Sequence, residues 1–175
     1  MTALYTIAYP FLNESDRLWI ESFRAAHDRS KQKVIAAHFT LVFGAAEVPV
    51  DRYQSHIESV VQGTSVIRFC FRYAMVCADQ HNDSAYVFLV PDEGYSAISK
   101  LHDLLYTGPL ESSLRLAFPY IPHMTVGYLP SQLEAKRLCD ILNEQNLEIA
   151  GVINTITVGS IKDGTFGNVA RYSLR

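Results

Sequence analysis

The stretch "HMTVGYL" at residues 123–129 places a histidine and a threonine in a segment whose other residues are typical of a buried strand. Burying an imidazole costs free energy unless its ring nitrogens find hydrogen-bond partners, so a histidine at this place suggests a function. The stretch "HFTLVFG" at residues 38–44 repeats the pattern of His, any residue, Thr and an apolar residue. Chance gives only about 0.3 His-x-Thr matches at this composition, so two matches in similar strands indicate a paired motif.

Strand geometry predicts which way the motif side chains point. Because successive side chains alternate between the two faces, His38 shares a face with Thr40, and His123 shares a face with Thr125. We expect Gly127 on that same face, where it would leave room for a ligand. The apolar residues of the two motifs would face the core: Phe39, Leu41, Met124 and Val126.

Two such strands facing one another across a cleft would gather two imidazoles and two hydroxyl groups around one small volume. Imidazole exchanges protons near neutral pH, so one histidine can take a proton from an attacking oxygen while the other protonates the leaving oxygen. Hydroxyl groups of Thr40 and Thr125 would then bind the non-bridging oxygens of a phosphate group. This set suits in-line displacement at phosphorus and requires neither a metal ion nor another cofactor.

The rest of the chain alternates strands with amphipathic helices, and no linker rich in Gly, Ser or Pro divides it. Strand-to-helix transitions follow both motifs, each through a short loop that contains a proline. We therefore predict an α+β fold and a single domain over residues 1–175. The helices are expected at about 16–27, 49–61, 95–106 and 131–145, and the strands at 3–12, 34–44, 65–78, 84–90, 122–129, 152–161 and 168–174.

Composition narrows the class of protein. With 49% hydrophobic and 19% charged residues the chain has the make-up of a globular protein with a packed core. A net charge of −3 provides no basic field for an extended nucleic-acid duplex, so a nucleic-acid partner would be a small nucleotide or an RNA terminus. The sequence contains no apolar run long enough to span a membrane and no evident secretion signal.

Cysteine usage bears on the compartment. Cys70, Cys77 and Cys139 are an odd number without CxxC spacing, which favours reduced thiols over a disulfide framework or a zinc site. Together with the absence of a signal, this predicts a cytoplasmic protein that interacts with no membrane.

Other polar candidates rank lower. The pairs His27-Asp28 and His102-Asp103 have the form found in metal-dependent phosphohydrolases, but both fall on or beside predicted helices, where solvent-exposed faces explain them. Arg171 and Lys162 of the closing hairpin could supply positive charge to a phosphate, and a solvated edge strand explains them equally well.

Aromatic residues precede the second motif. Phe118 and Tyr120 are candidates for stacking on a nucleobase that enters the cleft, although packing at its rim explains them as well.

The paired motifs and the run "LYTGPL…FPYIPHMTVGYL" resemble the two-histidine (2H) phosphoesterase superfamily, and within it the bacterial 2'-5' RNA ligase-like family. The resemblance extends over most of the chain. It implies a bilobal fold with two pseudo-symmetric lobes, each of which supplies an antiparallel sheet, flanking helices and one motif to a central cleft. It also implies catalysis by His38 and His123, with Thr40 and Thr125 as the donors to phosphate.

Three interpretations follow from these residues. The favoured one is a metal-independent phosphodiesterase that acts on a 2',3'-cyclic phosphate or on a 2'-5'-linked nucleotide or RNA end. The alternative is a non-catalytic module that binds a nucleotide or RNA end in the same cleft. In a third interpretation the two motif strands serve only as core of a scaffold protein. The sequence leaves open which histidine is the acid, which is the base, and the oligomeric state.

Overall fold

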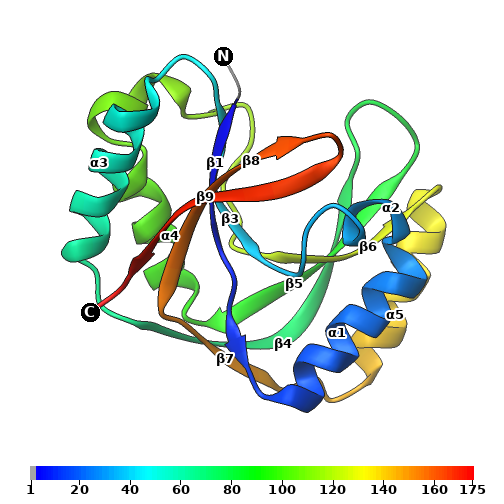
Figure 1. The fold of residues 1–175 in the computed structure, drawn as a ribbon. Coiled ribbons are helices and arrows are strands. Elements are labelled where there is room, and N and C mark those ends of the chain that lie inside the picture. Colours follow the sequence, from blue (N-terminus) through cyan, green and yellow to red (C-terminus); the bar gives the residue numbers. More distant parts are fainter. Residues whose placement is uncertain (1–2) are drawn as a thin grey trace.

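The computed structural model describes residues 3–175, whose strands and helices intermix along the chain (Figure 1). This confirms the predicted α+β class. The helices are α1 Glu14–His27, α2 Arg29–Gln32, α3 Val50–Gln62, α4 Tyr95–Leu105 and α5 Gln132–Glu144, with a 3-10 helix at Gly108–Ser113. The strands are β1 Leu4–Ala8, β2 Phe11–Leu12, β3 Phe39–Ala45, β4 Ile67–Ala78, β5 Ala85–Glu93, β6 Met124–Leu129, β7 Ile149–Ile153, β8 Thr155–Lys162 and β9 Thr165–Ser173.

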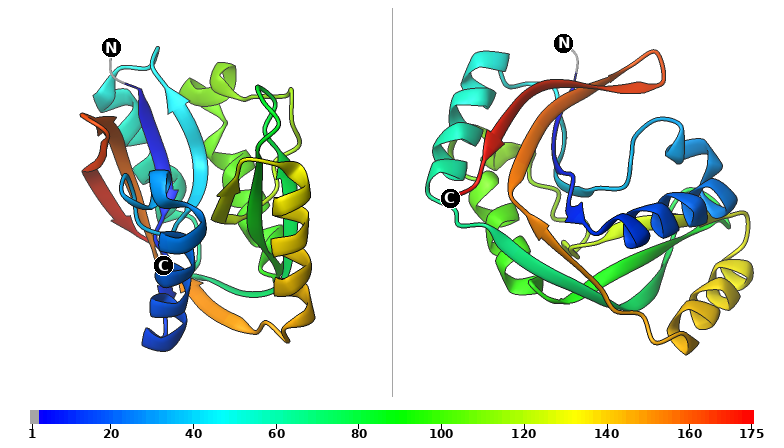
Figure 2. Two further views of the ribbon diagram at one scale, coloured as in Figure 1. Left: turned by 90° about the vertical axis from the view of Figure 1, so that its right-hand side faces the viewer. Right: turned by 60° about the horizontal axis from the view of Figure 1, so that its bottom comes forward.

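Within residues 3–175 the nine strands form one curled antiparallel sheet in the order β2-β7-β4-β5-β6-β3-β1-β8-β9. The order divides at β6 and β3, the two motif strands, which pair only through Phe39 and Met124 within the described chain. On one side of this junction lie β2, β7, β4, β5 and β6, and on the other β3, β1, β8 and β9, which the left view of Figure 2 shows as two groups of strands. The bilobal arrangement is thus confirmed, and the two motif strands are neighbours in one sheet rather than strands facing across a cleft.

The helices distribute between the two halves. Helix α5 packs on β4, β5 and β6, while α1 packs against β6 from the other side (Figure 2). Helix α3 packs against β9, and α4 lies beneath β3, β4 and β5. Each motif strand is followed by its own helix, α3 after β3 and α5 after β6, which is the repeat that the sequence indicated.

Aromatic residues join the halves beneath the junction. The Phe39 ring of β3 lies 5.1 Å from Phe69 and 5.5 Å from Phe71, both in β4. All three side chains are almost completely buried. Burial of a phenylalanine stabilises the fold by roughly 2–3 kcal/mol, so this cluster is a main contact between the lobes.

Two of the predicted strands are each divided in the structure. The opening strand 3–12 is interrupted at Tyr9 and Pro10, after which β2 pairs with β7 in the other half of the sheet. The proline has no N–H for a ladder, and the interruption lets one segment serve both lobes. The predicted strand at 152–161 is likewise two strands, β7 and β8, which lie in opposite halves.

The polar face of α1 is not solvated as predicted. Arg24 and Asp28 are buried, whereas the apolar Leu18 of the same helix is 50% exposed. His102, which was assigned to a solvated helix face, is also buried and stacks on the ring of Tyr120 with centroids 3.7 Å apart. Polar side chains with partners on a neighbouring element can be buried on a helix, and the helical pattern alone does not show such partners.

A bulge in the pairing of β5 with β6 gives Gly127 surroundings that differ from those expected from simple strand alternation. Val87 pairs with Gly127, and Phe88 pairs with Thr125, so one extra residue lies between them on β6. A Cβ on Gly127 would lie 3.3 Å from Val87 Cβ and 3.5 Å from Leu138 Cδ2 of α5. Gly127 therefore provides space for the packing of a helix, and the expectation that it opens room for a ligand was wrong.

Candidate active site

The two motif histidines have the same local geometry. Nδ1 of His38 lies 2.8 Å from the carbonyl oxygen of Ala36, and Nδ1 of His123 lies 2.6 Å from that of Ile121. A carbonyl only accepts, so each Nδ1 carries the proton and each neutral ring has its unprotonated nitrogen at Nε2. Within residues 3–175 neither Nε2 has a hydrogen-bond partner, which leaves both available to a ligand.

Strand register brings the four motif side chains together. Each histidine directly precedes its strand, and Phe39 lies opposite Met124 where the antiparallel strands meet. Extended by one residue on each side, this register would set His38 opposite Thr125 and Thr40 opposite His123. Because Phe39 and Met124 are fully buried on the opposite face, all four polar side chains share the other face of the sheet, where they are partly exposed. Cα atoms of residues opposite one another in such a pair are about 4.5–5.5 Å apart, so the four groups surround one small volume.

Burial keeps both imidazoles neutral. It lowers the pKa of His38 to about 4, with a smaller lowering by the positive charge of Arg24. Burial likewise lowers the pKa of His123, against the opposing effect of its bond to the Ile121 carbonyl. A positive charge on His123 would lower the pKa of His38 further, because like charges repel. At neutral pH the free protein therefore holds two neutral imidazoles.

An aromatic ladder supports His123. Its ring stacks on Phe88 of β5, with centroids 3.7 Å apart and planes 20° apart. Phe88 stacks in turn on Tyr86, whose ring lies against Tyr128 of β6. The ladder ends at Asp79, whose Oδ2 accepts from Tyr128 at 2.9 Å and from Tyr86 at 3.3 Å. One face of the His123 ring is thus covered by Phe88, and the ring edge that carries Nε2 remains available to a ligand.

The two candidate stacking residues differ in environment. Tyr120 donates its hydroxyl to the backbone oxygen of Thr40 at 3.0 Å, and one face of its ring is covered by His102. Tyr120 therefore ties the segment before the second motif to the first motif strand. Phe118 is 48% exposed and lies in the loop that leads to β6.

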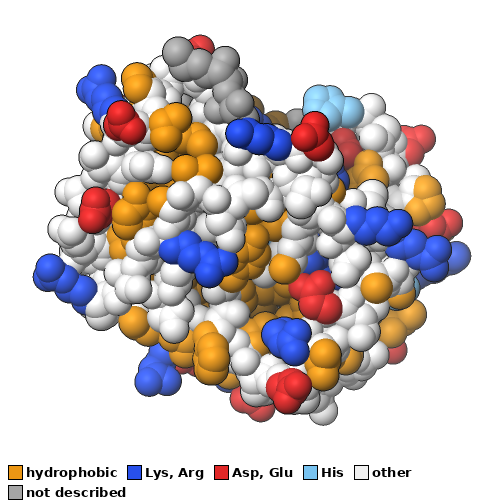
Figure 3. Space-filling model, in the orientation of Figure 1, with side chains coloured by type: hydrophobic (Ala, Val, Ile, Leu, Met, Phe, Trp, Pro, Cys, Tyr) orange, Lys and Arg blue, Asp and Glu red, His pale blue; other side chains and the backbone are white. Residues whose placement is uncertain are grey.

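Two adjoining hollows open beside His38. Both are lined by Tyr9, Pro10 and Ala36, and the Tyr9 ring lies 6.3 Å from the ring of His38. The larger hollow, of about 440 Å³, also has the exposed Arg171 of β9 on its wall. Figure 3 shows this face of the molecule, with apolar side chains deep in its central depression and charged side chains around it. The pKa of Tyr9 is raised by burial and lowered in part by the nearby charge of Arg171.

The family assignment rests on a match over most of the chain. A sequence model of the 2'-5' RNA ligase superfamily matches residues 12–165. The chain belongs to the 2'-5' RNA ligase superfamily. This confirms the resemblance to the 2H phosphoesterases and places the chain among phosphodiester-processing proteins. No curated protein sequence matches it.

Solved structures with the superfamily's fold agree with this assignment. E. coli LigT in apo form superposes with a TM-score of 0.57 at 17% identity, over 99% of this chain and 97% of LigT. A LigT complex with NADP+ gives 0.59 at 15% identity, over 99% and 98% of the two chains. Kluyveromyces marxianus Usb1 gives 0.57 at 10% identity, over 99% and 98%. At these identities the likeness shows the shared fold.

In this superfamily member, the structure brings His38, Thr40, His123 and Thr125 together and adds residues that the sequence analysis did not assign to the site. These are Tyr9 at the hollow, Phe88 under His123, and Glu21 of α1 behind His38. Arg171, which the sequence analysis named as one possible source of positive charge, lines the larger hollow. Only the aromatic character of Tyr9 and Phe88 was visible in the sequence. Their nearness to a histidine depends on strand order.

Among residues 3–175 no three His, Cys, Asp or Glu side chains gather in an arrangement that could hold a metal ion. No helix within that range is long and apolar enough to cross a bilayer. The three cysteines are free thiols.

Proposed function

We propose that this superfamily member is a phosphodiesterase that opens 2',3'-cyclic phosphates or cleaves 2'-5'-linked nucleotides or RNA ends without a metal ion. The observation that carries the proposal is the arrangement of two neutral imidazoles, each with Nδ1 bound to a carbonyl, on the face that also holds two threonine hydroxyls. Such a set provides a base, an acid and donors to phosphate oxygens.

Hydrolysis of a cyclic phosphate would proceed by in-line attack of water on phosphorus. Nε2 of one histidine accepts a proton from the attacking water as the new P–O bond forms. The other histidine, protonated at Nε2, donates its proton to the ribose oxygen as that P–O bond breaks. The hydroxyls of Thr40 and Thr125 donate to the non-bridging oxygens, which accumulate negative charge in the transition state.

An anionic substrate would change the protonation state of the histidine pair. Both rings are neutral in the free protein, and a phosphate placed beside them favours the charged form of a histidine. Substrate binding therefore raises the pKa of the general acid, and this histidine takes up its proton from solvent. The pair then holds one neutral and one charged imidazole only when a phosphate is bound.

Small nucleotides or RNA termini fit the proposal better than a duplex. The net charge of −3 provides no basic field for a duplex, and the larger hollow, of about 440 Å³, is within the size range of small-molecule sites. Solved LigT structures are complexes with NADP+, ATP and 3'-AMP, and one of Usb1 holds uridine monophosphate. We propose Phe118 and the ring of Tyr120 as contacts for a nucleobase. We further propose that residues 1–175 act as one domain in the cytoplasm.

The test is turnover of nucleoside 2',3'-cyclic phosphates in the presence of EDTA, followed by mass analysis of the product. His38→Ala and His123→Ala should each abolish ring opening while the circular dichroism spectrum stays that of the wild type. His81→Ala, in an exposed turn, is the matched control and should keep full activity. Turnover in both motif variants would refute the proposal. Calorimetric binding without ring opening by the wild type would instead favour the binding module.

A further inference from the structure

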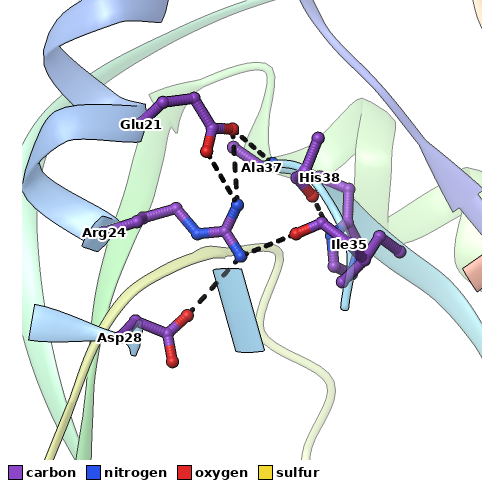
Figure 4. Close-up of polar contacts among 7 residues, drawn as sticks. Glu21, Arg24, Asp28, Ile35, Ala37 and His38 are labelled. Atoms are coloured by element: carbon purple, nitrogen blue, oxygen red, sulfur yellow. Dashed lines mark hydrogen bonds and ion pairs between the residues drawn. The ribbon is translucent and has the colours of Figure 1, made fainter. Parts of the chain in front are cut away.

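Helix α1 holds the segment that immediately precedes His38 (Figure 4). Oε1 of Glu21 accepts a hydrogen bond from the backbone N–H of Ala37 at 2.8 Å. Nη2 of Arg24 donates to the backbone oxygen of Ile35 at 2.9 Å. Two side chains of one helix thus bind the backbone on both sides of Ala36, the residue whose carbonyl receives the proton of His38 Nδ1.

The two bonds around Ala36 involve a single peptide unit. The carbonyl of Ala36 and the N–H of Ala37 belong to the same planar amide. At one end of this amide the N–H donates to the Glu21 carboxylate, and at the other end the oxygen accepts from His38. A carboxylate that accepts from an amide polarises it and makes its oxygen a better acceptor. The peptide therefore connects Glu21 to the imidazole as a continuous chain of hydrogen bonds.

Glu21 is itself held in place. Nη1 of Arg24 lies 3.3 Å from both of its carboxylate oxygens, and the Arg24 side chain is only 2% exposed. Nη2 of Arg24 also lies 3.5 Å from Oδ2 of the fully buried Asp28. Because the guanidinium is locked between two carboxylates, Glu21 has little freedom to leave the Ala37 amide.

The second histidine has no counterpart to this chain. His123 donates to the carbonyl of Ile121, whose peptide unit continues into Pro122. A peptide bond before proline has no N–H. No carboxylate can act on His123 through that amide, so its ring relies on stacking against Phe88. The two halves of the site thus orient their histidines by different means.

We propose that Glu21 is a positioning residue that fixes the orientation and the Nδ1–H tautomer of His38 through the Ala36–Ala37 peptide unit. The role in turnover rests on the proposed phosphodiesterase function, whereas the role in the tautomer does not. Groups that act on the His38 ring are the charges of Glu21 and Arg24 from α1 and His123 at the start of β6, with Tyr9 beside the ring and Arg171 beside Tyr9.

The primary test is the nitrogen NMR spectrum of the histidine rings at pH 7.5, where both are neutral. In the wild type, His38 and His123 should both show a single Nδ1–H tautomer. In Glu21→Ala the Ala37 amide loses its acceptor, and His38 should become a mixture of the two tautomers while His123 keeps its spectrum. Glu21→Gln retains an amide oxygen that can accept, so this variant should stay closer to the wild type than the alanine variant.

Controls separate this role from general damage to the fold. Glu144→Gln changes an exposed carboxylate on α5 and should alter neither ring. If Glu21→Ala does not fold, Glu21→Asp keeps the charge but shortens the side chain by one methylene, and the same tautomer mixture is expected. An unchanged His38 tautomer in a folded Glu21→Ala or Glu21→Asp protein would overturn the proposal.

Kinetics provide the second readout. We expect loss of Glu21 to lower activity about 10- to 100-fold, as when a group that orients a metal-bound histidine is removed, and the loss should lie in kcat with KM nearly unchanged. If the wild type has no turnover, the phosphodiesterase proposal fails, but the tautomer measurement still decides the role of Glu21. A lowered kcat with unaltered tautomers would assign Glu21 a merely structural role and refute the inference.

Discussion

Phe39 and Met124 lie opposite one another where β3 meets β6, and both side chains are fully buried on the face away from the motif histidines. This pair sets the register between the two halves of the sheet. A shift of one residue would turn one histidine and its threonine into the core. The relative placement of the four polar groups therefore depends on apolar residues that never touch a substrate.

Replacing Phe39 by alanine should destabilise the protein by about 3–5 kcal/mol, because it removes the ring that packs on Phe69 and Phe71 across the junction. Phe39→Leu retains most of the volume and should cost less than about 1.5 kcal/mol. The free energies of unfolding in urea test both values. Phe11→Ala, at a side chain that is 70% exposed, is the control, and equal stability of the Phe39 and Phe11 alanine variants would contradict the assigned role.

The threonine hydroxyls are expected to act on the transition state. Thr40→Val and Thr125→Val remove one donor each at nearly constant shape, and each should lower kcat about 100- to 1,000-fold with little change in KM. Thr165→Val, on the exposed β8-β9 hairpin, serves as the matched control. Steady-state kinetics with a nucleoside 2',3'-cyclic phosphate make the measurement. A rise in KM at unchanged kcat would show that the hydroxyls bind only the ground state.

Tyr120 supports the first motif from the segment before the second. Tyr120→Phe removes the hydroxyl that donates to the Thr40 carbonyl and leaves that carbonyl without this donor, so a loss of about 1 kcal/mol in stability is expected. Because the backbone at Thr40 is then held less firmly, kcat should fall as well. Tyr73→Phe, at a ring that is 51% exposed, should change neither quantity. If Tyr120→Phe has the wild-type free energy of unfolding and the wild-type kcat, then Tyr120 does not support the first motif.

Much of the site was predictable because it follows from local rules. The alternation of side chains along a strand places His38 with Thr40 and His123 with Thr125, and the buried Phe39 and Met124 agree with it. The repeated strand-then-helix order was equally visible in the pattern of apolar residues. These features depend on neighbours in sequence, which the chain itself displays.

Features that depend on distant partners were not predictable in this way. Arg24 on a helix is ordinarily solvated, and its burial follows from carboxylates and a backbone oxygen that only the fold brings to it. The same holds for His102, which is covered by Tyr120. Gly127 was misplaced because a bulge in a strand pair leaves no reliable mark in one sequence. Partners remote in sequence therefore account for most of what was missed.

Acidification should destabilise the protein through His38. In the unfolded chain a histidine takes up a proton as pH falls through about 6.5, whereas burial keeps the folded ring neutral until its pKa of about 4. The unfolded state thus binds more protons between these values, and stability falls as pH is lowered across this window, by an amount on the order of 1–3 kcal/mol for this ring. His38→Gln removes the titrating group, so its stability should fall less steeply from pH 6.5 to 4 in urea unfolding series. His81→Gln, at an exposed histidine, should follow the wild-type curve, and parallel curves for His38→Gln and the wild type would contradict the assigned burial.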